Sequence, residues 1–208
     1  MTGFAAVVLT GGAARRMGGA DKPAMPVGGR PMRDRVLDAV AGCVPRIVVG
    51  PGRTSGVDSD LPTDVRVTRE DPPGGGPVAA TAAGLALVDP AVATTALLAG
   101  DLPMLTGEAI RQLAERLDAS GADGVVYLDD TGRRQPLCGV WRTDALRAAI
   151  DRLRTERAAR GDTLAGASMR ALLSRLRVVE VSWAGSGPPP WFDCDTDDDV
   201  RRAEEWNR

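Results

Sequence analysis

The chain has 208 residues, of which 43% are hydrophobic and 26% are charged, and its formal net charge is −2. This composition is typical of a globular protein rather than a disordered one, and the slight acidity argues against non-specific nucleic-acid binding, which needs a basic surface. Histidine is absent from the chain, which excludes Ser-His-Asp and Cys-His catalysis as well as histidine metal ligands.

Short apolar runs alternate with longer amphipathic stretches along the whole chain. In chain order, the pattern predicts a strand at 4–9, a helix at 32–44, strands at 46–49 and 65–67, a helix at 78–88, a strand at 95–99, a helix after Thr106, a strand at 123–128, a helix at 143–157, a strand at 178–181 and a last helix from about Thr196. Strands that alternate with helices of this length form βαβ units. The sequence therefore predicts one three-layer α/β/α domain at 1–208 with a mostly parallel sheet.

The first predicted strand runs directly into a glycine-rich segment, LTGGAARRMGGADK, at 9–22. In a parallel sheet this junction lies at the carboxyl end of the strand, where α/β proteins bind ligands. Gly11 and Gly12 allow backbone amides to approach an anion, and Arg16 and Lys22 add positive charge. The segment matches neither GxxxxGK[ST] nor GxGxxG, which disfavours a Walker loop and a nicotinamide site. We expect it to bind phosphates.

A single carboxylate, Asp101, follows the predicted strand at 95–99 and precedes Leu102-Pro103. A carboxylate at the end of a buried strand is well placed to hold a hard cation through oxygen. The alternative is that Asp101 caps the next helix, but Thr106 is better placed for that cap. Asp101 is therefore a candidate metal ligand.

An acidic segment, FDCDTDDDV at 192–200, precedes the last predicted helix. Its simplest interpretation is a solvated helix start, in which Thr196 is the cap and the acidic first turn is favoured by the helix dipole. The loop DPPGGGP at 71–77 is, by itself, typical of a flexible connection.

Taken together, these segments resemble the molybdenum cofactor guanylyltransferases, within the larger family of sugar-nucleotide-type nucleotidyltransferases. LTGGAARRMGGADK is similar to the family's LAGGxxxRMGxDK, with Thr10 in place of Ala. Further matches follow in the family's order over most of the chain: GRPM at 29–32, DPPGGGP at 71–77, GDLP at 100–103, QPL at 135–137 and FDCDTDDDV at 192–200. The resemblance implies a Rossmann-like nucleotidyltransferase fold.

The resemblance also implies a reaction, the Mg²⁺-dependent transfer of GMP from GTP to the phosphate of molybdopterin that carries molybdenum. Arg16, Lys22 and Asp101 would be the catalytic residues, and Mg²⁺ would bind Asp101 and Asp195. The nucleotide would contact Leu9, Thr10, Gly11, Gly12, Lys22, Asp71 and Asp101. QPL at 135–137 would line the acceptor side.

One departure concerns the base. The family often has Asn shortly after its second strand, whereas this chain has VGPGR at 49–53, without a side-chain amide. We therefore expect guanine selectivity to be weaker than is usual in the family. The alternatives are a cytidylyl transferase, an enzyme that activates another phosphorylated small molecule, and an inactive nucleotide-binding homologue.

The chain has no signal-peptide pattern and no apolar run of the roughly 20 residues that cross a bilayer. Its three cysteines, Cys43, Cys138 and Cys194, lack CxxC spacing, which favours reduced thiols over zinc ligands or disulfides. We expect a cytoplasmic protein that binds GTP and a phosphorylated pterin, makes transient contacts with cofactor-biosynthesis proteins or molybdoenzymes, and binds neither nucleic acid nor membrane.

Overall fold

The computed structural model describes residues 3–11, 22–50 and 61–207, and all statements below refer to these ranges. They form a central seven-stranded sheet and a small two-stranded one. In sheet order, the central strands are β5 (Val65–Thr68), β4 (Arg46–Val49), β1 (Phe4–Leu9), β6 (Thr94–Ala99), β8 (Arg134–Arg142), β7 (Gly124–Leu128) and β9 (Val178–Val181). Strands β2 (Pro26–Val27) and β3 (Arg30–Pro31) form the small antiparallel sheet.

The central sheet is mostly parallel, as predicted. Strands β5, β4, β1 and β6 pair in parallel, and so do β7 and β9. Strand β8 pairs antiparallel with both β6 and β7, so it alone among the described central strands runs against the others. The carboxyl ends of the parallel strands and the start of β8 therefore lie at one edge of the sheet.

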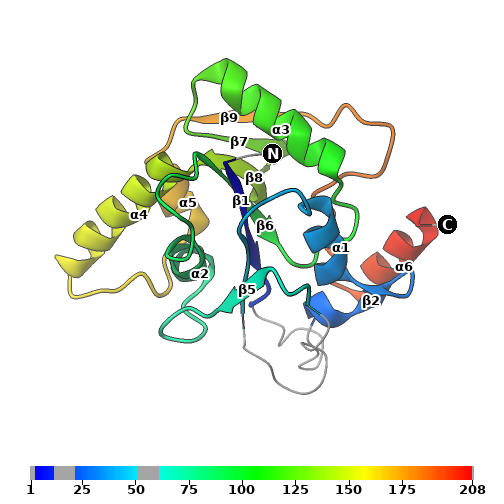
Figure 1. Ribbon diagram of the computed structural model, residues 1–208, viewed down its shortest axis with the longest axis horizontal. Helices are drawn as coiled ribbons and strands as arrows, with labels where there is room; N and C mark the ends of the chain where they lie inside the picture. The colour runs from blue at the N-terminus through cyan, green and yellow to red at the C-terminus, as the bar shows by residue number, and fades with distance from the viewer. Residues whose placement is uncertain (1–2, 12–21, 51–60, 208) are drawn as a thin grey trace.

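Helices cover both faces of the sheet, which gives the predicted three layers (Figure 1). Helices α1 (Met32–Ala39) and α3 (Gly107–Ser120) pack on one face, and α2 (Pro77–Leu85), α4 (Thr143–Ala158) and α5 (Met169–Leu173) on the other. Helix α6 (Asp197–Trp206) contacts β2, and the short 3-10 helix η2 (Lys22–Ala24) contacts α1.

The apolar run of β1 explains why both faces are covered. Its side chains alternate between the two hydrophobic cores: Ala6 and Val8 belong to the α1–α3 core, and Val7 and Leu9 to the α2–α4 core. A strand buried on both sides has a continuous hydrophobic run in its sequence.

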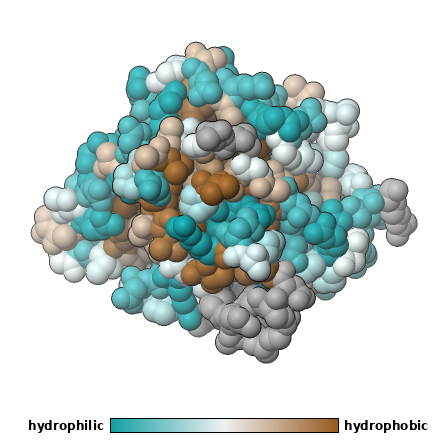
Figure 2. Space-filling view, viewed as in Figure 1, coloured by the Kyte–Doolittle hydropathy of each residue, from teal (hydrophilic) through white to brown (hydrophobic). Residues whose placement is uncertain are grey.

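The surface in Figure 2 is mostly polar, with hydrophobic residues reaching it mainly in the middle of the visible face.

Two helices differ from the prediction by more than one residue at one end. Helix α1 ends at Ala39 rather than at 44, and its chain continues in turns, in which Ala41 N donates to Asp38 O and Cys43 N to Val40 O. Pro45 disfavours helical backbone in the residue before it, and Gly42 is a weak helix former. Helix α2 begins at Pro77 and ends at Leu85, one residue earlier and three residues earlier than predicted.

Strand β8 and helix α5 were missing from the predicted elements. Pro136 argues against a strand because it cannot donate a ladder hydrogen bond. In the structure it lies at an irregularity: Gly139 pairs with Val126, but Tyr127 pairs with Gln135. The intervening residues of β8 leave the ladder with β7, and such bulges admit proline and often border binding sites.

No helix in the described ranges has the length and apolarity that crossing a membrane requires. The three cysteines are buried, and none of them forms a disulfide within the described ranges.

Candidate functional site

A cavity of about 370 Å³ opens at the carboxyl edge of the sheet. It is lined by residues 9–11 after β1, residues 99, 101 and 102 at and after the end of β6, and residues 135–138 at the start of β8. Strand β1 is followed in the chain by β4 and β5 on one side of it, and β6 then pairs on its other side. The crevice between β1 and β6 is therefore the topological switch point, where open α/β sheets bind ligands.

The end of β1 carries backbone groups into this cavity. Thr10 N donates to Val49 O at 2.8 Å, and Gly100 N donates to Leu9 O at 2.9 Å. These bonds extend the sheet pairing by one residue beyond β1 and hold Thr10 and Gly11 at the cavity wall. Leu9, Thr10 and Gly11 thus lie where the sequence predicted a ligand.

The side chain of Thr10 fills the space between two glycines. A Cβ atom at Gly50 would lie 2.1 Å from Thr10 Oγ1, and one at Gly100 would lie 2.8 Å from Thr10 Cγ2. Thr10 Oγ1 also donates to Val49 O at 3.2 Å. Thr10 in place of Ala and the lack of a side chain at position 50 are therefore linked, because Thr10 occupies the volume that a larger residue at position 50 would need.

Asp101 is half-buried and lines the cavity directly after β6. It does not cap the following helix, because Thr106 Oγ1 accepts from Ala109 N at 3.2 Å, as predicted. The capping alternative for Asp101 is therefore wrong.

The acidic segment at 192–200 divides into two parts. Thr196 and Asp199 form a capping box at the start of α6, and the Asp199 carboxylate accepts from Thr196 N at 2.8 Å and from Asp195 N at 3.1 Å. Asp193 and Asp195, in contrast, line the cavity. The sequence indicated Asp195 as a ligand candidate but not Asp193, which lies two residues earlier in the same segment.

Asp71 does not lie among the residues that line the cavity; it is exposed in the loop between β5 and α2. The neighbouring Glu70, which the sequence gave no reason to select, is buried, and its Oε1 accepts from Gly74 N at 2.9 Å. Gly75 O accepts from Gly166 N at 2.8 Å, which ties the loop to the segment before α5.

Some predicted residues lie outside the described part of the chain. Gly12 and Arg16 belong to residues 12–21, and only the backbone of Lys22, in η2, is described. Their roles stay predictions.

The groups that line the cavity include carboxylates and one thiol. Burial raises the pKa of the Cys138 thiol, so this group stays protonated and is a poor nucleophile. The described residues contain no cluster of three or more Cys, Asp or Glu arranged to hold a metal. Asp101 and Asp195 form a smaller set of oxygen donors, which suits a hard cation that takes its remaining ligands from water and phosphate.

The chain matches the family model of the MobA-like NTP transferase domain over residues 6–177. It is 37% identical over 194 residues to a probable molybdenum cofactor guanylyltransferase of Mycobacterium tuberculosis, covering 89% of this chain and 86% of that protein. It is 28% identical over 211 residues to a molybdenum cofactor guanylyltransferase of Bradyrhizobium sp., covering 98% and 92%.

Solved structures share the fold. Molybdopterin-guanine dinucleotide biosynthesis protein A from Archaeoglobus fulgidus superposes with a TM-score of 0.72 at 20% identity, covering 97% of each chain. A Mycobacterium tuberculosis protein in complex with manganese gives a TM-score of 0.64 at 21% identity, covering 97% of this chain and 98% of that one. A 4-diphosphocytidyl-2C-methyl-D-erythritol synthase from Anaerococcus prevotii gives 0.69 at 15% identity, covering 98% and 95%.

Proposed function

Because the chain belongs to the MobA-like NTP transferase family, we propose that it transfers GMP from GTP to the phosphate of molybdenum-bearing molybdopterin and releases pyrophosphate. The observation that supports this most is the switch-point cavity, which places the backbone after β1 opposite Asp101 after β6. Such a site can hold a nucleotide phosphate between backbone groups and a cation-binding carboxylate.

The reaction suits a site without histidine. The attacking group is a phosphate monoester, whose second pKa is about 6, so its oxygen is already ionised at neutral pH. That oxygen attacks the α-phosphorus of GTP, and the bond to the pyrophosphate leaving group breaks. Catalysis of this kind rests on positioning and charge neutralisation, so the chain needs no general base.

We propose that the reaction depends on Mg²⁺ held by Asp101 and Asp195. The fit rests on the donor set: both side chains offer carboxylate oxygen and line the same cavity, and Mg²⁺ commonly binds one or two carboxylates together with substrate phosphates. When bound, the ion would supply Lewis-acid polarisation of the α-phosphate. The chain's own residues would hold the nucleotide in place.

The remaining nucleotide contacts stay proposals from the sequence. Arg16 and Lys22 would neutralise the triphosphate and the leaving group, with Gly12 completing the glycine turn. Asp71 would accept from N1–H and the amine of guanine, since guanine presents both donors on one edge. Its exposure in the loop after β5 supports a contact with a base that extends out of the cavity.

A cytidylyl transfer is the second candidate. Gly50 has no side-chain amide that could contact a purine, and the structure of the Anaerococcus prevotii protein, whose name refers to a cytidyl group, shares the fold. For either donor we propose a cytoplasmic location and transient contacts with cofactor-biosynthesis proteins or molybdoenzymes, where the acceptor is made and the product is used.

The test is pyrophosphate release with molybdopterin and each of GTP, CTP, ATP and UTP, at equal Mg²⁺. We expect GTP to be preferred by several-fold. Thermal stabilisation by each nucleotide is the parallel measurement, since a ligand at 100 times its Kd stabilises by about 2.7 kcal/mol. A preference for CTP would overturn the assignment of GTP as the donor. If no nucleotide released pyrophosphate, the proposed nucleotidyl transfer would be wrong.

A further inference from the structure

Trp191 is the single aromatic residue in the described lining of the cavity, and its ring packs against Tyr127. The ring of the buried Tyr127 lies against it, with centroids 5.1 Å apart and an angle of 39° between the planes. The Tyr127 hydroxyl oxygen lies 2.8 Å from Ala109 O and 2.7 Å from Gln112 Oε1, so its single proton has two acceptors within hydrogen-bond distance. The Trp191 ring is therefore backed by a side chain that cannot easily move.

The backbone around Trp191 is also constrained. It follows the run Pro188-Pro189-Pro190, in which proline fixes φ, and the next amide, Phe192 N, donates to Pro189 O at 3.1 Å. A ring that is positioned before a ligand arrives loses little conformational entropy on binding.

The sheet order separates two sides of the cavity. Strands β4 and β5, and the loop with Asp71, lie on the β1 side, whereas β8, β7 and β9 follow β6 on the other side. Trp191 comes from the loop after β9, and the start of β8 lines the same side. Asp101, after β6, lies between the two. If the nucleotide phosphates lie along the end of β1, the Trp191 side is left for the second substrate.

The polar groups beside Trp191 specify what kind of ring would bind. Gln135 Nε2 donates one of its two N–H groups to Asp129 Oδ2 at 2.8 Å, which fixes the side-chain amide, and the Gln135 carbonyl oxygen remains an acceptor. Asp193, two residues from Trp191 in the chain, adds a carboxylate to the same lining. Acceptor groups next to an aromatic face match a flat heterocycle with N–H donors along its edge.

We propose that Trp191 is the stacking platform for the acceptor's ring, a flat N–H-bearing heterocycle with a phosphate ester on its side chain, such as a phosphorylated pterin. This rests on the proposed function, in which that phosphate reaches the α-phosphorus of the nucleotide near Asp101. Trp191 contacts the substrate ring away from the reacting atoms, so it sets acceptor affinity and leaves the chemistry to other residues.

The experiment compares Trp191→Leu, which keeps apolar bulk but removes the aromatic face, with Trp191→Phe, which keeps a ring. Trp191→Leu should raise KM for molybdopterin by about 10- to 100-fold, as loss of one base–aromatic stack does, with KM for GTP unchanged. Trp191→Phe should restore much of that loss. Calorimetry with a phosphorylated pterin lacking molybdenum should show the same order of affinities without any turnover.

Trp183→Leu is the matched control. Trp183 also contacts Tyr127, with ring centroids 5.9 Å apart, but it lines a different groove beside α3. If Trp191 acted only by supporting Tyr127, both Leu variants would weaken acceptor binding alike, which would overturn the proposal. An effect of Trp191→Leu on GTP instead of the pterin would also overturn it. Failure of the proposed function is seen separately, as wild-type protein that releases no pyrophosphate from GTP.

Discussion

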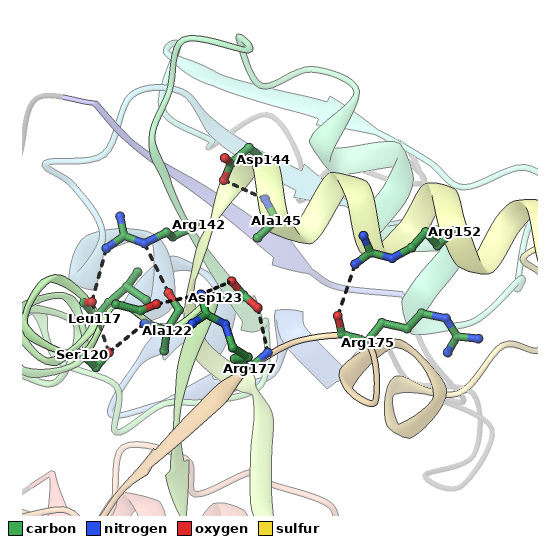
Figure 3. A network of polar contacts seen from close by, with 11 residues as sticks. Leu117, Ser120, Ala122, Asp123, Arg142, Asp144, Ala145, Arg152, Arg175 and Arg177 are labelled. Carbon is green, nitrogen blue, oxygen red and sulfur yellow. Dashed lines mark hydrogen bonds and ion pairs between the residues drawn. The ribbon is translucent and has the colours of Figure 1, made fainter.

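At the amino ends of β7 and β9, polar side chains bond to one another and to the backbone (Figure 3), whereas the carboxyl ends of β1 and β6 border a cavity. Asp123 Oδ2 accepts from Arg177 N at 2.8 Å, and Arg177 Nη2 donates to Gly121 O at 2.9 Å. Arg142 Nε donates to Ala122 O at 3.2 Å. These contacts tie the end of α3 to the starts of two strands and the end of β8.

The comparison shows how residue composition alone misleads. Both edges carry Asp residues beside strand ends, and the cavity of about 370 Å³ lies at the carboxyl edge. Asp123 is satisfied by Arg177 next to it in the sheet, so its charge serves the fold. Asp101 and Asp195, in contrast, line the cavity at the switch point. Asp101 and Asp123 both lie next to a strand, but only the end of the strand at which each lies decides whether it borders this cavity.

At the carboxyl edge, which borders the cavity, replacing Asp101 should have the largest effect on turnover. Asp101→Asn should lower turnover by more than about 100-fold, because loss of one charge-stabilising group at a reacting centre costs roughly 3 kcal/mol or more. The measurement is pyrophosphate release over a Mg²⁺ titration, with circular dichroism to verify the fold. Near-normal turnover would remove Asp101 from the mechanism.

The Thr10–Gly50 contact tests the packing of the same edge. Gly50→Ala should destabilise the protein by about 1–3 kcal/mol, because the new methyl group overlaps Thr10 Oγ1. In the Thr10→Ala background, most of that loss should disappear. Denaturant unfolding of the four variants in a double-mutant cycle measures the coupling. Equal losses in both backgrounds would show that Thr10 is not the obstacle.

Asp123→Asn probes the opposite edge, and it should cost about 1–2 kcal/mol of stability while leaving turnover unchanged. Although partial burial of Asp123 alone raises its pKa, hydrogen bonds from the Arg177 amide and guanidinium lower it overall. The carboxylate therefore stabilises the fold above its unfolded-state pKa, and this contribution is lost as pH falls through the lowered folded-state value.

The measurement for Asp123 is denaturant unfolding of wild type and variant from neutral to acidic pH. The gap between the two should close as the pH falls. A gap that persists at low pH, or a large loss of turnover, would contradict the structural role of Asp123.

The smallest effect concerns the base. Asp71→Asn should reduce the preference for GTP over the other nucleotides by several-fold, since loss of one hydrogen-bond partner costs about 0.5–1.5 kcal/mol. Competition between nucleotides at equal Mg²⁺ measures it, and Asp118→Asn serves as an exposed carboxylate control on α3. An unchanged preference in Asp71→Asn would show that Asp71 does not read the base.

The sequence was sufficient for features that depend on local pattern. The bounds of β1, β4 and β9, the Thr106 cap and the Thr196 cap are confirmed, because each depends on residues a few positions apart. The location of residues 9–11 and Asp101 at one edge also followed, since parallel strands place their carboxyl ends together.

The rest depends on contacts between distant parts of the chain. Pro136 argued against a strand at β8. The structure accommodates this proline at a shift in the pairing between β7 and β8, which the local sequence does not predict. Trp191 and Asp193 join the cavity because the loop after β9 returns to β6, which no local pattern contains. The acidic stretch at 192–200 gave no means of separating ligand candidates from the first turn of α6.

The place of β8 in the sheet has a consequence for synthesis of the chain. Strand β8 inserts between β6 and β7, although it is made after both. Until residues 134–142 leave the ribosome, β6 has a partner on its β1 side only, and its other edge is open. At roughly 5–20 residues per second, the stretch from the end of β6 through the end of β8, residues 100–142, takes about 2–9 seconds to make. An open, hydrophobic strand edge recruits other strands, so we expect a nascent chain paused in this interval to be prone to aggregation.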